Sequence, residues 1–263
     1  MIVKEEKEES FMNPVIVRNV AIGEGMPKIC VPIVDQTKQE ILETAQEAKK
    51  SPADLLEWRA DFFEAVFDIE AVKAVLAELR NILGEMPLLF TFRTKNEGGE
   101  KEISFPQYGA LLKEVAATGL ADLMDVEVYF HEMVPELIAE LKQTGIVVVG
   151  SNHDFEKTPQ KREIIQTLGY MQFIGADISK IAVMPQNQRD VLTLLYATEE
   201  MVSQYADRPI ITMSMAGLGT VSRISGETFG SAVTFGALKK SSAPGQMDVV
   251  ELKNILETLH CVQ

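Results

Sequence analysis

Short apolar runs alternate along the chain with longer segments in which apolar residues recur every three or four positions. This alternation is typical of parallel β-strands joined by crossover helices. The runs are residues 28–34, 55–61, 87–93, 123–128, 145–153, 178–184, 209–215 and 231–236. We therefore expect eight strands, each followed by a helical connection.

The connections carry apolar residues at the spacing of one helix face. The seventh, residues 216–230, is rich in glycine and should hold only a short helix. Predicted core stripes include Val72, Val75, Leu76 and Leu79 after the second run, Val191, Leu192 and Leu195 after the sixth, and Leu252, Leu256 and Leu259 after the eighth.

Eight strands with crossovers close most simply into an α/β fold of the (β/α)8 TIM-barrel type. A doubly wound open sheet is the alternative, but it usually has a glycine-rich phosphate loop after its first strand. Residues 34–37 contain no glycine. Residues 14–24 (PVIVRNVAIGE) predict an added β-hairpin that closes one end of the barrel.

Length and composition fit one large domain. The chain has 263 residues, of which 46% are hydrophobic, so a sizeable core is available. We expect residues 1–13 to form a mobile charged leader and residues 14–263 a single catalytic barrel domain. The first residues lack the order of a signal peptide, and no apolar run is long enough to span a bilayer.

Net charge and cysteine content limit the kinds of partner and cross-link that we expect for this chain. A net charge of −14 argues against a nucleic-acid partner, because such binding requires Lys and Arg to neutralise phosphates. Cys30 and Cys261 are too few for a disulfide framework and have no metal-site spacing. We expect Cys30 to be a buried thiol, and we expect a cytoplasmic protein without a membrane partner.

The charged residues of the runs gather near their ends. In a barrel, functional groups lie at the C-terminal ends of the strands and in the loops that follow. Charged side chains inside apolar strands are costly unless they are paired or functional. Residues at these positions are Glu57, Arg59, Asp61, Arg93, Lys95, Glu97, Asp125, Glu127, His153, Asp154, Lys180, Arg223, Ser242 and Gln246.

Lys180 lies in residues 178–183 (ISKIAV), a run that should be buried on both faces. Lost hydration and nearby arginines would disfavour its ammonium and favour a nucleophilic free amine. The alternative is a lysine at a strand edge that extends to water. The run alone does not decide between the two.

His153 follows small residues that leave space around its ring, and histidine suits proton transfer near neutral pH. A lone histidine is more often structural. We expect His131 and His260 to be solvated surface residues. Three scattered histidines, with neither a His-x-x-x-His pair nor a cysteine-rich partner, argue against a metal site.

Glu97 precedes Gly98 and Gly99, which would let its carboxylate fold back over the barrel mouth and orient an imidazole. A solvated loop acid is the alternative. Arginines are suited to planar carboxylates, so Arg59, Arg93 and Arg223 are candidates for anion binding. If they are structural ion pairs instead, we expect Glu57 to be their partner.

A series of short motifs runs in order along nearly the whole chain. They include LEWR (56–59), LLFTFR (88–93), EGG (97–99), SNHDFEKTP (151–159), KIAVMP (180–185), ITMSM (211–215), SR (222–223), TFG (234–236) and SAPGQ (242–246). Each alone is weak. Together, at this spacing, they resemble the type I 3-dehydroquinate dehydratases from about residue 17 to residue 262.

The resemblance implies a lyase that converts 3-dehydroquinate to 3-dehydroshikimate by syn dehydration, in the shikimate pathway of aromatic amino acid and chorismate biosynthesis. It implies that Lys180 forms a Schiff base with the substrate ketone. His153 would remove the C2 proton and return it to the departing C1 hydroxyl, and Glu97 would hold His153. The residues expected to bind the substrate carboxylate and hydroxyls are Glu57, Arg59, Arg93, Arg223, Ser242 and Gln246.

One position departs from some relatives, which carry a serine where this chain has Pro32, and this puts one substrate hydrogen bond in doubt. Two other functions stay open: another Schiff-base barrel lyase of the class I aldolase kind, and a non-catalytic barrel that binds a sugar acid. We expect no cofactor and no metal. By family resemblance we expect a homodimer.

Residues 239–246 have the small, polar and turn-forming composition of a mobile loop. We predict that this loop is a lid, open in the empty enzyme and closed when the substrate engages Ser242 and Gln246.

Overall fold

A computed structural model of the protein describes residues 13–238 and 242–260. Consecutive strands pair in parallel from β10 through β3 to β9. The ring closes where the Ala232 N–H donates to the Ile210 carbonyl oxygen at 2.8 Å. The barrel strands are β3 (Lys28–Ile33), β4 (Leu55–Arg59), β5 (Leu88–Thr91), β6 (Leu123–Glu127), β7 (Val147–Asp154), β8 (Ile178–Val183), β9 (Ile210–Ser214) and β10 (Val233–Ala237). The predicted (β/α)8 barrel is confirmed.

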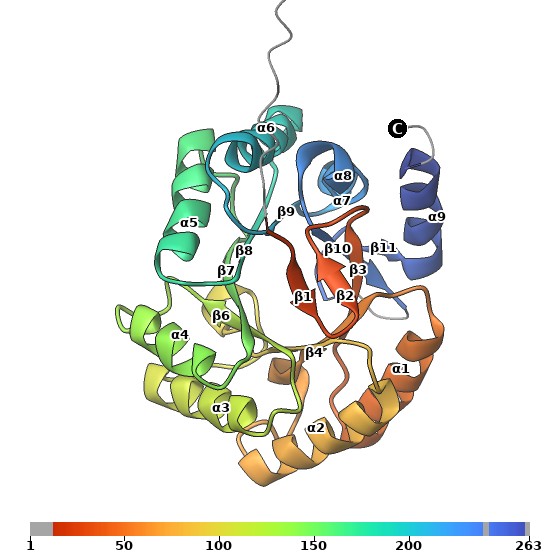
Figure 1. The fold of residues 1–263 in the computed structure, drawn as a ribbon, viewed down its shortest axis with the longest axis vertical. Helices are drawn as coiled ribbons and strands as arrows, with labels where there is room; N and C mark the ends of the chain where they lie inside the picture. Colours follow the sequence, from red (N-terminus) through yellow and green to blue (C-terminus); the bar gives the residue numbers. More distant parts are fainter. Residues whose placement is uncertain (1–12, 239–241, 261–263) are drawn as a thin grey trace, which may run out of the picture.

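The helices form a ring around these strands (Figure 1). The seventh connection holds only short helices, as predicted, and β11 (Met247–Asp248) pairs with β10 outside the ring. The helices are α1 (Lys38–Lys50), α2 (Ile69–Leu83), α3 (Phe105–Ala117), α4 (Val134–Lys142), α5 (Lys161–Phe173), α6 (Gln188–Gln204), α7 (Thr220–Ile224), α8 (Gly226–Phe229) and α9 (Val249–His260). Single-turn 3-10 helices lie at Ala60–Phe62 (η1), Lys95–Glu97 (η2) and Gly217–Gly219 (η3).

Local sequence sets where the helices begin. Thr37 and Glu40 form a capping box at the start of α1, and the Asn187 side chain accepts two backbone N–H groups at the start of α6.

The predicted core stripes are buried with two exceptions. Leu192 of α6 is 63% exposed and Leu259 of α9 is 41% exposed, so their assignment to the core was wrong. Each stands at the edge of its stripe, where the helix turns away from the sheet.

The core has two separate parts. One lies between the strands and the surrounding helices, and the other lies inside the barrel. The inner part is built from alternate strand residues, because successive side chains of a strand point to opposite faces. At the start of the strands the inward residues are apolar: Leu55, Leu89, Leu123, Val149 and Ile178.

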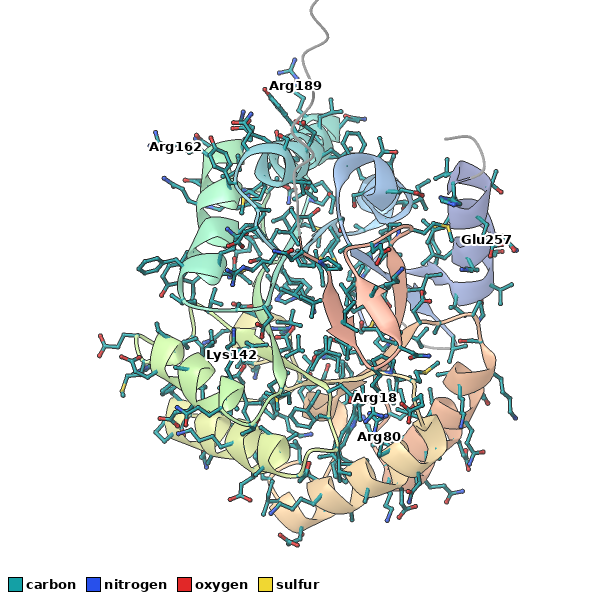
Figure 2. The ribbon with its side chains drawn as sticks, viewed as in Figure 1. Arg18, Arg80, Lys142, Arg162, Arg189 and Glu257 are labelled. Carbon is teal, nitrogen blue, oxygen red and sulfur yellow. The ribbon has the colours of Figure 1, made fainter. Side chains whose placement is uncertain are left out.

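The predicted N-terminal hairpin is present as β1 (Val15–Val17) and β2 (Val20–Ile22), paired antiparallel. Figure 1 shows it crossing one open end of the barrel. Val17 and Ile22 belong to the inner apolar cluster, so the hairpin closes the end where the strands begin. Arg18 in its turn binds Asp122, which Arg80 also binds, and the two arginines lie side by side in Figure 2.

The predicted leader lies outside the described residues except for Asn13. Among the residues that are described, no helix is long and apolar enough to cross a membrane. Cys30 is a free, buried thiol as expected, and burial raises its pKa well above the ordinary value. His131 and His260 are exposed, as expected, and Cys261 lies outside the described residues.

Candidate active site

A pocket of about 440 Å³ opens at the end of the barrel where the strands finish. Its position follows from the parallel arrangement, which brings the C-terminal ends of all eight strands to one mouth. Arg223 does not line this pocket, whereas the other predicted site residues do. Those residues are Glu57, Arg59, Arg93, Glu97, His153, Lys180, Ser242 and Gln246.

Lys180 lies at the base of the pocket on β8, and only 3% of it is exposed. Its Nζ donates to Asp125 Oδ2 at 3.1 Å and lies 3.6 Å from Glu57 Oε1. The Phe235 ring lies against the same nitrogen, with its centroid 4.9 Å away. The alternative of a lysine extending to water is therefore wrong, because its amine is enclosed by two carboxylates and an aromatic face.

Glu97 orients His153, as its neighbouring glycines predicted. Glu97 Oε2 lies 2.8 Å from His153 Nδ1 and accepts the His153 backbone N–H at 3.0 Å. The Asn152 amide donates to Glu97 Oε1 at 3.1 Å. Gly98 has φ 83°, and a Cβ at Gly99 would stand 1.9 Å from the Arg93 carbonyl oxygen. Only glycines allow this loop to fold back over the mouth.

The protonation of this pair suits a group that removes and then returns a proton. Burial and the charge of Glu127 raise the pKa of Glu97 to about 8. Burial and the charges of Arg93 and Lys180 hold the pKa of His153 well below its ordinary value. The titrating proton belongs to the pair. With it, Nε2 carries an N–H and can act as an acid; without it, Nδ1–H points at Glu97 and Nε2 is a free base.

Arg93 is the centre of a buried ionic network. Its Nη2 donates to Asp125 Oδ1 at 2.9 Å, and its Nη1 donates to Glu127 Oε1 and Ser151 Oγ, each at 3.0 Å. Its Nη1 also lies 3.6 Å from Glu97 Oε2. These carboxylates raise the pKa of Arg93 against the effect of burial, so the guanidinium stays charged.

Arg59 pairs with Asp61 through two parallel hydrogen bonds of 2.8 Å. Asp61 also accepts the backbone N–H groups of Arg93 and Glu100, which ties Arg59 to the loop that carries Glu97. Glu57 pairs with no arginine among the described residues and instead accepts the Thr91 hydroxyl at 2.9 Å. The expectation that Glu57 is the arginines' partner was therefore wrong.

Arg223 lies on α7, behind the pocket, and is 1% exposed. Its Nη2 donates to the Pro244 carbonyl oxygen at 3.0 Å. Its Nε and Nη1 are buried and have no hydrogen-bond partner within the described part of the chain. Burial lowers the pKa of Arg223 to about 10. A buried cation with unpaired donors favours the approach of an anion.

Ser242 and Gln246 hold each other at the rim of the pocket. Gln246 Oε1 accepts the Ser242 N–H at 2.9 Å, and Gln246 Nε2 donates to Ser242 Oγ at 3.0 Å. Between them, the Pro244 carbonyl also accepts the Ala216 N–H at 3.1 Å. Residues 239–241 of the predicted lid lie outside the described residues, and opening of the lid stays a prediction.

Asp125 and Glu127 are fully enclosed members of the site that the sequence placed at a strand end without a role. The signal was their spacing: both stand at even intervals after the inward Leu123, as Glu57 and Arg59 stand after Leu55. No signal in the sequence predicted the apolar wall of the pocket, which is formed by Phe155, Ala182, Met213, Met215 and Phe235.

Pro32 lies on β3, in register with Glu57, but it does not line this pocket. It borders a separate hollow with Val34 and Asp35. Within residues 13–238 and 242–260, no group of three or more His, Cys, Asp or Glu side chains could hold a metal ion.

Fold and site together define a barrel enzyme that has a buried lysine and a histidine–glutamate pair facing one pocket. A family model for type I 3-dehydroquinase matches residues 29–262. The 3-dehydroquinate dehydratase of Clostridioides difficile is 55% identical over 245 residues, which are 93% of this chain and 96% of that protein. The Listeria innocua protein of the same name is 54% identical over 95% of this chain and 99% of its own length.

Solved structures agree. The type I 3-dehydroquinate dehydratase of Clostridium difficile superposes with a TM-score of 0.93 at 54% identity, covering 95% of this chain and 99% of that one. The Geobacillus kaustophilus 3-dehydroquinate dehydratase gives a TM-score of 0.92 at 40% identity, covering 95% and 97%. The chain belongs to the type I 3-dehydroquinase family.

Proposed function

We propose that this protein is a hydro-lyase that converts 3-dehydroquinate to 3-dehydroshikimate through a Schiff base on Lys180. Family membership over nearly the whole chain supports the overall reaction. The observation that carries the route is the enclosed Lys180 amine at the base of a pocket that His153 and Glu97 also line. The related Clostridium difficile enzyme was solved with covalently modified comenic acid, which supports covalent chemistry in this family.

In the proposed first step, the Lys180 nitrogen bonds to the substrate ketone carbon and the ketone oxygen leaves as water. The product is an iminium, which acts as an electron sink for the neighbouring C–H bond. The apolar wall formed by Phe235, Met213 and Met215 excludes water from one side of this intermediate.

In the second step, the free-base form of His153 removes the C2 proton, and the electron pair moves toward the iminium nitrogen to give an enamine. The C–O bond at C1 then breaks, and His153 returns the proton so that the hydroxyl leaves as water. Glu97 keeps the imidazole in position through both transfers, because it binds both Nδ1 and the backbone N–H of His153. A water molecule then hydrolyses the conjugated iminium and frees Lys180.

The substrate carboxylate and ring hydroxyls need partners that the pocket supplies. We assign carboxylate binding to Arg223, whose Nε and Nη1 lack partners within the described residues. Arg59, Arg93, Glu57, Ser242 and Gln246 would bind the remaining oxygens. Since Arg223 stands behind the pocket wall, the 242–246 segment has to shift slightly for the anion to reach it, which fits the predicted lid.

The test is a direct assay. We expect ultraviolet absorbance of the conjugated enone to appear when 3-dehydroquinate is added. Borohydride added with the substrate should inactivate the enzyme and attach ligand mass to the peptide that contains Lys180. Label on another lysine, or no label while turnover continues, overturns the imine. Cleavage of a carbon–carbon bond instead would indicate an aldolase, and binding without turnover a sensor. Chelators should not change the rate.

The lid has its own test. Lys239 and Lys240 are trypsin sites within the predicted lid sequence, residues 239–246. Trapped ligand should protect these sites, and Gln246→Ala should weaken the protection, because the Gln246 side chain binds Ser242 across the segment. Equal cleavage with and without trapped ligand rules out the lid.

The family resemblance supports two further proposals, a homodimer and a cytoplasmic location. Light scattering of the purified chain tests the first, and fractionation of the source cells tests the second.

A further inference from the structure

Asp125 is the carboxylate nearest to the Lys180 amine, and it is held more firmly than any other group that touches that nitrogen. It is fully buried on β6. Its Oδ2 accepts from Lys180 Nζ at 3.1 Å, while its Oδ1 accepts from Arg93 Nη2 at 2.9 Å and from Ser151 Oγ at 2.6 Å. Both oxygens are therefore held by side chains from Ser151 on β7, Lys180 on β8 and Arg93 just after β5.

Imine formation keeps the charge at this nitrogen constant. An ammonium and a ketone give an iminium and water, so one positive charge is present before and after this step. The number of N–H bonds falls from three to one. A single carboxylate in a fixed position can therefore face both the ammonium and the iminium without rearranging, and it can bind the one N–H that remains, which the neutral enamine also keeps.

Two carboxylates compete for that last N–H, and their surroundings differ. Glu57 lies further from Nζ, at 3.6 Å, lines the pocket, and is held at Oε1 by the Thr91 hydroxyl. Asp125 is closer, does not line the pocket, and cannot turn toward the substrate without losing Arg93 and Ser151. Glu57 can thus bind substrate, whereas Asp125 is held in position to bind the Lys180 nitrogen.

We propose that Asp125 is the positioning residue and permanent counter-ion of Lys180, holding Nζ in place before imine formation and balancing the iminium afterwards. This inference rests on the proposed imine chemistry. Burial alone would raise the pKa of Asp125, but Arg93 and Lys180 outweigh burial and hold that pKa below its ordinary value. The carboxylate is therefore charged throughout the working range of pH.

The test is Asp125→Asn, which keeps the shape and removes the charge. Borohydride trapping should be followed as a rate against pH with 3-dehydroquinate. We expect trapping to slow on the order of 10²-fold with little change in KM, since one preorganised electrostatic contact to the reacting charge is lost. Its pH profile should shift to lower pH, because an amine without its counter-ion releases its proton more easily. The other charged or titratable groups around Lys180 are Cys30 on β3, Glu57 on β4, Arg93 just after β5 and His153 on β7.

Glu127→Gln is the matched control. Glu127 is a buried carboxylate on the same strand and binds the same arginine, but it makes no contact with Lys180 in the described structure. The pH profile of trapping should move less in Glu127→Gln than in Asp125→Asn, because Glu127 does not touch the amine. A profile that moves equally in both variants, or in neither, overturns the role of Asp125. If the wild type itself is not labelled at Lys180, the imine fails instead, so the two failures are distinguishable.

A third variant covers the case in which Asp125→Asn does not fold. Ser151→Ala removes the hydrogen bond that Ser151 donates to Asp125 and the one it accepts from Arg93, and it leaves every charge paired. Trapping by this variant should slow by about threefold to tenfold, because Asp125 keeps its charge and loses only part of the support that holds it in place. An unchanged trapping rate in a folded Ser151→Ala protein contradicts the proposal.

Discussion

Where the barrel strands begin, the side chains inside the ring are leucine, valine and isoleucine, and a hairpin covers them. Two residues further along the same strands, the inward positions are Glu57, Thr91, Asp125, Ser151 and Lys180. Both layers are almost completely buried. The apolar layer needs only close packing, whereas the polar layer needs each group to find a partner. The apolar end of the barrel thus stabilises the fold, and the rigid strands that result hold the charged side chains of the other end in place, buried away from water.

The largest effect should come from the polar layer. Lys180→Ala should reduce kcat by on the order of 10⁴-fold or more, since Lys180 is the one lysine among the described residues that line the pocket. Steady-state kinetics and borohydride labelling measure it together. Lys95→Ala is the control, because that lysine side chain is 61% exposed. Substantial turnover by the Lys180 variant would contradict the imine route.

His153→Ala should come next, with kcat reduced by about 10²–10⁴-fold through loss of general acid–base catalysis. The imine should still form, so borohydride should still label Lys180. This pair of results would distinguish the role of His153 as proton carrier from the role of the Lys180 imine as electron sink. A near-normal dehydration rate in the variant would remove His153 from the role of base.

A substitution at the apolar end of the barrel should lower stability and leave catalysis unchanged, the opposite of a substitution in the polar layer. Ile22→Ala, at a fully buried hairpin residue, should lower the free energy of unfolding by about 2–5 kcal/mol while kcat stays unchanged. Urea unfolding and the enone assay give the two readings. Ile16→Ala in the same hairpin is the control: Ile16 is 61% exposed, and its loss should cost less than about 0.5 kcal/mol. A fall in kcat for Ile22→Ala would show that the two ends are not independent.

The last predicted effect depends on pH. The folded protein raises the pKa of Glu97 from 4.5 to about 8, so the protonated carboxyl favours folding at low pH and that contribution is lost as pH rises through this window. Relative to Glu97→Gln, the wild type should lose unfolding free energy as pH rises from 4.5 to 8. Parallel curves for the two proteins over this range would contradict the raised pKa.

Much of this layout could be predicted from the sequence. A strand that is buried on both faces appears in the sequence as a continuous apolar run. The eight strands, and the polar residues that interrupt them, could therefore be predicted. Lys180 and His153 stood out because each interrupts such a run. The glycines after Glu97 predicted its return to His153, and the structure has that contact.

The partners within the network could not be predicted. Asp125 and Lys180 are 55 residues apart in sequence and meet only because their strands stand at matching levels around the ring. In the alternative of structural ion pairs, Glu57 was expected to be the arginines' partner by charge alone, but Asp61 pairs with Arg59, and Asp125 and Glu127 pair with Arg93. Leu192 was misassigned for a related reason, since helical spacing defines a stripe but not how far its edge reaches over the sheet.

The seam between β9 and β10 has a consequence for motion. β7 and β8 pair continuously from Val149 with Ile178 to Asp154 with Val183. In contrast, β9 is joined to the segment just before β10 by one bridge, between Ile210 and Ser231. Arg223 follows the strand on one side of this seam, and Pro244 follows the strand on the other. Arg223 and the Pro244 carbonyl oxygen that it binds can therefore separate without breaking a long ladder. Amide hydrogens along this seam should exchange with solvent before those of any other barrel strand pair. Motion of the barrel strands relative to one another should therefore occur at the junction of β9 and β10.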